Sequence, residues 1–274
     1  MESAKLHGQI IGHYAEHHEH EWKRLSKGKA ILEFITTVHY LERYLPGRGT
    51  ILDLGSGPGK YAVWLADRGY DVVAVDPVEV NIRSLTYRMR ALGLSKHLKK
   101  AYIGYAQNLD FIESKTFDAV VCLGGPFSHI MSLHERKTAA SEILRVAKRK
   151  AKIFISVMGR LDSFGGTVRD YQRDLDSSFI DKWVDTGDYP GGYGFTPFHG
   201  FRPDELEKLF GRRIHLAAKT ALEGYTAFTT EEEISRLKRN KDRWNKFLKI
   251  HLSICEEPET IGVSEHYMIV GTKP

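Results

Sequence analysis

A glycine-rich turn between two aspartates has the clearest chemical use in this sequence. Asp53 lies at the end of the apolar segment 50–55, and the run 55–59 (GSGPG) follows it, before a segment with helical spacing. Glycine permits positive φ and lets a ligand approach backbone amides closely. A second apolar segment ends at Asp76, nineteen residues after Gly57. A carboxylate there lies beside the tip of the first strand and accepts hydrogen bonds from both hydroxyls of a ribose.

Two common glycine-rich sites do not fit this turn. A dinucleotide site usually reads GxGxxG, because its third glycine allows tight packing of helix against strand near the pyrophosphate. Here Lys60 stands at that place, and the spacing is GxGxG. A phosphate-binding P-loop needs GxxxxGK[ST], which is absent. Together with Asp53 and Asp76, the turn favours a cofactor site over a strand–helix turn kept only for packing.

The elements around the turn alternate between strands and helices. Such alternation, with helices of 10–15 residues, predicts a parallel sheet that is covered by helices on both faces. The expected strands are 50–55, 71–76, 101–105, 117–124 and 152–158, and the expected helices are 60–68, 81–92 and 135–148.

We expect a single domain over residues 1–274. Its parts are an N-terminal helical segment (1–45), a cofactor-binding core (46–158), a lid inserted above the sheet (159–200) and a C-terminal part of the sheet (201–274). The helical segment has an apolar stripe of Ile31, Phe34, Ile35, Val38, Leu41 and Leu45. The lid contains a short helix near 168–176, and the C-terminal part contains a helix at 202–210, strands at 214–222 and 266–273, and a basic helix at 231–255.

The order of these motifs resembles a known family. DLGSGPG followed by VAVD is similar to the class I S-adenosylmethionine (SAM)-dependent methyltransferases of the small-molecule type, over most of residues 47–158 and more weakly over 196–274. The resemblance implies a doubly wound, mostly parallel α/β sheet of seven strands, the Rossmann-like methyltransferase fold, with an antiparallel final strand. It also implies SAM as the cofactor and transfer of its methyl group to an O, N or S nucleophile of a small organic molecule.

The resemblance implies a set of cofactor-binding residues. These are Tyr14, Asp53, Gly55, Ser56, Gly57, Asp76, Pro77, Ala106, Gln107, Asn108, Leu123 and Gly124. The backbone of the turn holds the methionine end of SAM, and Asp53 supports its amino group directly or through water. Asp76 binds the ribose hydroxyls, and Pro77 or Val78 lies near the adenine. Tyr14 resembles a family tyrosine that closes over SAM; the alternative is an ordinary half-buried helix residue.

Adenine recognition departs from the family pattern. The family often has Asp-Ala after the third strand, whereas this chain has Tyr105-Ala106. Gln107, Asn108 or the backbone alone then supplies the polar contact to the adenine.

The chemistry itself requires few dedicated residues. Methyl transfer from a sulfonium is an in-line displacement, so the protein chiefly holds the nucleophile against the methyl group in a dry site. A general base is needed only if the acceptor arrives protonated. His129 follows the fourth strand, where substrate and cofactor meet in this family, and an unperturbed pKa near ~6.5 suits a base. The alternative is a histidine that only caps or hydrogen-bonds the following helix.

Two further catalytic candidates, Tyr193 and His199, lie in the lid. Aromatic residues next to flexible glycines suit a lid that shields an organic acceptor. The alternative is a loop whose aromatic side chains only cover the core.

Two other groups of residues are less specific. His13, His17 and His20 share helical spacing, but lack a further carboxylate or cysteine at a known spacing, so we expect a solvated helix face and no metal site. The basic helix 231–255 favours an exposed surface with Ile234, Leu237, Trp244, Leu248 and Leu252 facing inward. An RNA-contacting face is the alternative.

Composition indicates the class of protein and its cellular environment. The formal charge of +5 is mild, and 42% of residues are hydrophobic, an ordinary globular balance. No apolar run approaches the ~20 residues needed to cross a bilayer, so we expect no membrane. Cys122 and Cys255 have no CxxC partner, which favours a reducing cytoplasm. An RNA-directed enzyme and a non-catalytic SAM-binding protein are the alternative functions, and a homodimer is left open.

Overall fold

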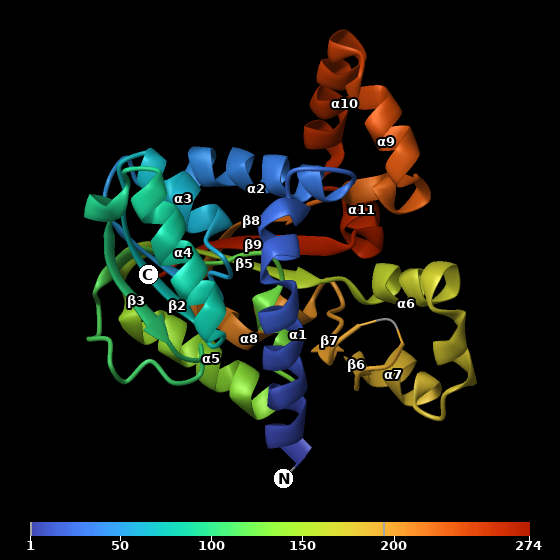
Figure 1. The fold of residues 1–274 in the computed structure, drawn as a ribbon, viewed down its shortest axis with the longest axis horizontal. Coiled ribbons are helices and arrows are strands. Elements are labelled where there is room, and N and C mark those ends of the chain that lie inside the picture. The colour runs from blue at the N-terminus through green and yellow to red at the C-terminus, as the bar shows by residue number, and fades with distance from the viewer. Residues whose placement is uncertain (1, 194) are drawn as a thin grey trace.

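The computed structural model describes residues 2–193 and 195–274, and a seven-stranded sheet forms its centre (Figure 1). The spatial order is β3-β2-β1-β4-β5-β9-β8. The strands are β1 (Thr50–Leu54), β2 (Asp71–Asp76), β3 (Leu98–Ile103), β4 (Phe117–Cys122), β5 (Ala147–Met158), β8 (His215–Ala221) and β9 (His266–Thr272). The first five are parallel, and β9 is antiparallel to both β5 and β8. The predicted doubly wound sheet is therefore confirmed, including its antiparallel final strand.

The strands are continuous apolar runs because both faces of the sheet are covered. Side chains alternate across a strand, so Leu52 and Val120 belong to one buried cluster, while Ile51 and Val121 belong to the other. The first cluster is completed by α5 (Leu133–Val146) and α8 (Glu205–Phe210). The second is completed by α2 (Ala30–Tyr44), α3 (Lys60–Asp67) and α4 (Glu79–Ala91).

The N-terminal helical segment is two helices. The long helix α1 (Glu2–Arg24) packs against α4, and a break that includes Gly28 with φ +57° separates it from α2. Figure 1 shows α1 at a steep angle to α2. This turn of the chain lets α1 lie beside the ends of the strands, while α2 lies on one face of the sheet.

The lid region folds as α6 (Arg160–Asp170), α7 (Ile180–Thr186) and a small hairpin of β6 (Asp188–Tyr189) and β7 (Phe198–His199). A 3-10 turn at Gln172–Asp176 separates the two helices, so the helix expected at 168–176 begins eight residues earlier. Several lid aromatics pack on one another, and Trp183, Tyr189 and Phe198 form a buried cluster with Met158. The lid thus has a small core of its own.

The basic helix expected at 231–255 is also two helices, α9 (Glu231–Lys238) and α10 (Lys241–Ile254). Asn240 accepts a hydrogen bond from the Arg243 amide and starts the second helix. Figure 1 shows both projecting away from the sheet, and α11 (Pro258–Val263) leads back to β9. Of the five residues expected to face inward, Ile234 is buried and the other four are half-buried.

Two remaining features are the absence of a membrane-spanning helix in the described residues and the state of the two cysteines. None of the helices in the described residues combines the length and apolarity that a membrane crossing requires. Cys122 and Cys255 are both buried and free.

Candidate functional site

A cavity opens at the carboxyl ends of β1, β2 and β4, beside α1. The strand order reverses at β1: β2 and β3 follow on one side of it, and β4 and β5 on the other. Ligands of open α/β sheets bind at the carboxyl ends of the strands at such a switch point. Most of the predicted site residues line this cavity: Tyr14, Gly55, Ser56, Gly57, Asp76, Pro77, Ala106, Gln107, Leu123, Gly124 and His129. Asn108 does not line it and is exposed, with its amide bonded to the Tyr105 carbonyl.

The glycine-rich turn has the backbone that only glycine adopts easily. Gly55 and Gly57 have φ of +66° and +52°. A Cβ atom at Gly55 would lie 2.4 Å from the Cβ of Pro126, whereas at Gly57 it would meet no atom within 4 Å. Gly55 is therefore required for packing, and Gly57 faces open space in the cavity.

We expect alanine at these two glycines to have different effects. Gly55→Ala should lower the melting temperature, because the clash with Pro126 adds to the strain of a positive φ. Gly57→Ala should weaken SAM binding more than it lowers stability, because its methyl group enters the ligand space. Thermal unfolding and SAM calorimetry on both variants measure the difference. Equal melting temperatures for the two variants would contradict this assignment.

Asp76 is fixed at the floor of the cavity. Its Oδ2 accepts from the Gly57 amide at 2.8 Å, and its Oδ1 accepts from the Val78 amide at 2.9 Å and from Asn81 Nδ2 at 3.1 Å. Burial raises the pKa of Asp76, and these three hydrogen bonds oppose that rise. The carboxylate thus ties the glycine turn to the end of β2. Asn81, which sequence reasoning did not single out, supports it.

Asp53 lies behind the turn rather than in the cavity wall. It is 1% exposed, and its Oδ2 has no hydrogen-bond partner in the described chain. Burial, and secondly the nearby Asp76 carboxylate, raise the pKa of Asp53 to about 7. Ser56 Oγ is buried without a partner as well. Two carboxyl groups and unpaired polar atoms beside a cavity fit a ligand that carries positive charge and hydrogen-bonding groups.

Tyr14 and His129 join α1 to the segment after β4. The Tyr14 hydroxyl lies 2.7 Å from His129 Nε2, and His129 Nδ1 lies 2.8 Å from the Pro197 carbonyl oxygen. A carbonyl only accepts, so Nδ1 carries the proton and Nε2 accepts from Tyr14. Burial lowers the pKa of His129 to about 4. The neutral ring therefore has its lone pair occupied, and action as a base would require Tyr14 to release it.

This burial predicts a loss of stability on acidification. Between pH 6.5 and about 4, the unfolded chain binds a proton at residue 129 that the folded chain excludes, so stability is complete above that window and falls within it. His251, whose pKa burial also lowers to about 4, acts in the same direction. We expect His129→Gln to flatten the fall of melting temperature between pH 7 and pH 4. An unchanged pH profile would contradict the assignment.

A second cavity adjoins the first. The two share Tyr14, Glu21, Arg24 and Gly124 in their walls. Lid aromatics line the second cavity, namely Trp183, Tyr189, Phe195 and Phe198. His13, His17 and His20 also line it, so this face of α1 is not only a solvated surface. A small molecule in the second cavity would therefore lie next to a ligand in the first, at the place where the two cavities share these residues.

Two predicted catalytic residues do not reach either cavity. Tyr193 is 69% exposed. His199 is buried, with Nδ1 2.6 Å from Asp188 Oδ1 and Nε2 3.5 Å from Glu205 Oε2. His199 joins the β6–β7 hairpin to α8, because those two carboxylates belong to these elements. Other aromatic residues of the same segment, Phe195 and Phe198, do line the second cavity.

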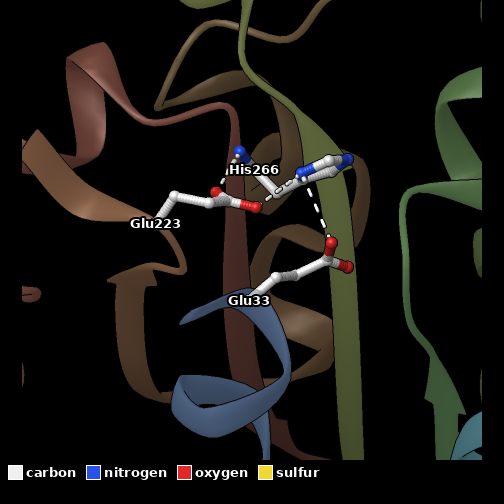
Figure 2. Close-up of side chains that lie close together, drawn as sticks. All are labelled: Glu33, Glu223 and His266. Carbon is white, nitrogen blue, oxygen red and sulfur yellow. Dashed lines mark hydrogen bonds and ion pairs between the residues drawn. The ribbon is translucent and has the colours of Figure 1, made fainter. Parts of the chain in front are cut away.

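A buried charge network borders both cavities. Glu33 is 0% exposed, and its Oε2 lies 2.6 Å from Arg24 Nη1 and 3.9 Å from His266 Nδ1. Glu223 Oε1 lies 2.9 Å from the same His266 nitrogen (Figure 2). Sequence reasoning missed these four residues. They come from four separate segments of the chain, and the one sign of them in the sequence is a charged residue, Glu33, within the apolar stripe of 31–45.

Comparison with known proteins agrees with this architecture. Residues 51–150 match a family model described as a methyltransferase domain. The matched segment contains the glycine turn and Asp76. A glycine/sarcosine N-methyltransferase of Aphanothece halophytica is 27% identical over 137 residues, which are 50% of this chain and 46% of that protein. The corresponding enzyme of Parasynechococcus marenigrum (strain WH8102) is 26% identical, over 52% and 49% of the two chains. The chain thus matches about half the length of these curated relatives.

Solved structures share the fold over more of the chain. A SAM-dependent methyltransferase from Methanosarcina mazei aligns with a TM-score of 0.59 at 21% identity, covering 85% of this chain and 96% of that one. The 1,6-didemethyltoxoflavin-N1-methyltransferase of Burkholderia thailandensis, solved with its substrate and S-adenosylhomocysteine, aligns with a TM-score of 0.58 at 13% identity. That alignment covers 98% of this chain and 89% of the other.

Proposed function

We propose that this protein is a SAM-dependent methyltransferase that acts on a small organic molecule. The observation that carries the proposal is the pair of adjoining cavities, one at the glycine turn and Asp76, the other under the lid. When bound, SAM supplies an electrophilic methyl group. The enzyme's own residues bind and orient the two partners and exclude water from between them.

The first cavity has the donors and acceptors for each part of SAM. Asp76 Oδ2 keeps one acceptor site for a ribose hydroxyl, because Gly57 uses the other and Oδ1 already accepts from Val78 and Asn81. Asp53 favours the positive charge of the amino group through the turn. Pro77 and Gln107 border the space left for the adenine.

The second cavity holds the methyl acceptor. Its aromatic wall and its position under the lid suit a small organic molecule that is shielded from water. Tyr14 lies at the wall between the cavities, and burial raises its pKa, so its hydroxyl stays protonated and donates to His129. The curated relatives are named as N-methyltransferases, which supports nitrogen among the O, N and S nucleophiles. The two free cysteines fit a reaction in the reducing cytoplasm.

Transfer of labelled methyl groups into a cell extract tests the function. The extract is incubated with the protein and methyl-labelled SAM, and the products are sorted by size. We expect label in small metabolites, and clearly less label with Asp76→Ala when the SAM concentration is close to the Kd of the parent protein. Label in RNA would favour the nucleic-acid alternative instead. Tight SAM binding without any transfer would favour a non-catalytic SAM-binding protein.

A further inference from the structure

His266 presents an unused hydrogen-bond donor to the second cavity. It is the first residue of β9, it is 5% exposed, and it lines the second cavity but not the first. Its Nδ1 faces Glu223 and Glu33, and Figure 2 shows Nε2 at the opposite side of the ring, turned away from both carboxylates. No hydrogen bond to another described residue uses Nε2.

The ring is positively charged at neutral pH. Burial alone would lower the pKa of His266, but the carboxylates of Glu33 and Glu223 outweigh burial and raise it to about 10. An imidazolium donates from both nitrogens, so Nε2 carries a proton. A buried charged donor without an acceptor is costly, which indicates that a ligand completes it.

Arg24 provides a second free donor, near Gly124 and Gly125. Arg24 uses Nη1 for Glu33 and Nε for Glu21, and no described residue accepts a hydrogen bond from its Nη2. A Cβ atom at Gly124 would lie 3.7 Å from Arg24 Nη2, and one at Gly125 would lie 3.3 Å from His266 Nε2. These adjacent glycines place one stretch of backbone beside both nitrogens, and Arg24 and His266 both line the second cavity.

The arrangement does not suit a metal ion. Glu33, Glu223 and His266 lie close enough together to suggest one. However, Arg24 already pairs with Glu33 Oε2, and the Ser264 hydroxyl and the His266 amide both donate to Glu223 Oε2. The protonated imidazolium has no lone pair to offer a cation.

We propose that His266, together with Arg24, binds a carboxylate group of the methyl acceptor in the second cavity. This inference rests on the proposed function. A carboxylate matches two N–H donors that carry positive charge. Five acidic residues (Glu21, Asp162, Asp170, Glu231 and Glu265) also line this cavity, against the two further basic residues Lys29 and Arg169, which disfavours a group of higher negative charge such as a phosphate. Arg24 borders both cavities, but His266 lines only the second, so we assign the anion to the acceptor rather than to SAM.

Matched acids and amides test the proposal. The probes are sarcosine and L-phenylalanine with their primary amides, titrated into protein saturated with S-adenosylhomocysteine. We expect at least one acid to bind, and its amide to bind at least about tenfold more weakly. His266→Gln should weaken binding of the acid by at least about tenfold and leave that of the amide unchanged. His251→Gln is the control, since His251 is a buried histidine that lines neither cavity.

The outcomes separate the inference from the function that it extends. Equal binding of acid and amide, no binding of either acid, or an unchanged acid affinity in His266→Gln would overturn the carboxylate site while S-adenosylhomocysteine still binds. Failure of the parent protein to bind S-adenosylhomocysteine would instead overturn the proposed function. Should His266→Gln not fold, Glu223→Gln replaces it. That variant weakens the charge on the ring but keeps Nε2, and it should also weaken binding of the acid.

Discussion

Replacing Asp76 with alanine should lower the affinity for SAM by about tenfold or more. The substitution removes a charge-assisted hydrogen bond to the ribose together with the negative charge beside it. It also releases the amides of Gly57 and Val78, which Asp76 holds at 2.8 and 2.9 Å. The glycine turn then loses its fixed position, so the loss should exceed that of the ribose contact alone. Isothermal titration calorimetry with SAM measures the effect.

Two variants identify its cause. Asp76→Asn retains an acceptor oxygen and the shape of the side chain but removes the charge, so its affinity should fall between those of the parent and Asp76→Ala. Asp71→Ala is the matched control. Asp71 is the first residue of the same strand, at the end far from the cavity, and it pairs with Lys99. It should leave SAM affinity unchanged. An unaltered affinity in folded Asp76→Ala would remove Asp76 from the site.

The part of the fold that could be predicted from sequence is the part where both faces of a strand are buried. Strands β1, β2 and β4 are almost wholly buried, so each is a continuous apolar run with a clear end. The edge strand β3 carries exposed lysines at 99 and 100, which hid its first three residues. A strand with one neighbour needs fewer apolar side chains, and its sequence signal is correspondingly weaker.

The packing face of α2 was predicted only in part, for a related reason. The apolar stripe of Ile31, Phe34, Ile35, Val38, Leu41 and Leu45 is mostly half-buried. The deeply buried residues instead include Glu33, Thr36 and Thr37. Thr36 Oγ1 donates to the Leu222 carbonyl, and Arg24 pairs with Glu33. Polar side chains can face a core when distant segments supply partners, and hydrophobic periodicity contains no information about those partners.

The candidate site divides along the same line. The glycine turn and Asp76 could be found because one βαβ unit places them together, and the turn requires glycine locally. The partner of His129 could not, because Tyr14 lies 115 residues away and reaches it only through the packing of α1. Tyr193 and His199 were chosen for residue type, but the orientation of a lid side chain depends on the tertiary fold. Arg24 and His266 depend on it entirely.

Loss of Arg24 should be the most damaging single change to the stability of the buried network. Glu33 is 0% exposed, and without Arg24 its nearest cation is His266, 3.9 Å away. Breaking a buried ion pair by removing one partner costs about 3–5 kcal/mol, and here the remaining carboxylate loses its only hydrogen-bonded cation among the described residues. We therefore expect Arg24→Met to lower the free energy of unfolding by about that amount in denaturant titrations. Arg83→Met, which breaks the exposed pair with Glu79, should cost no more than ~1 kcal/mol.

The double variant Arg24→Met/Glu33→Gln shows whether charge is the cause. Neutralising Glu33 removes the uncompensated carboxylate, so the double variant should be more stable than Arg24→Met alone, and the coupling between the two positions should be large. If the double variant is as unstable as Arg24→Met, the loss comes from packing of the arginine stem. In that case Arg24 would hold α1 in place sterically, and Nη2 would be oriented by shape rather than by Glu33. The same measurement thus tests whether the Arg24–Glu33 ion pair orients Arg24 in the proposed carboxylate site.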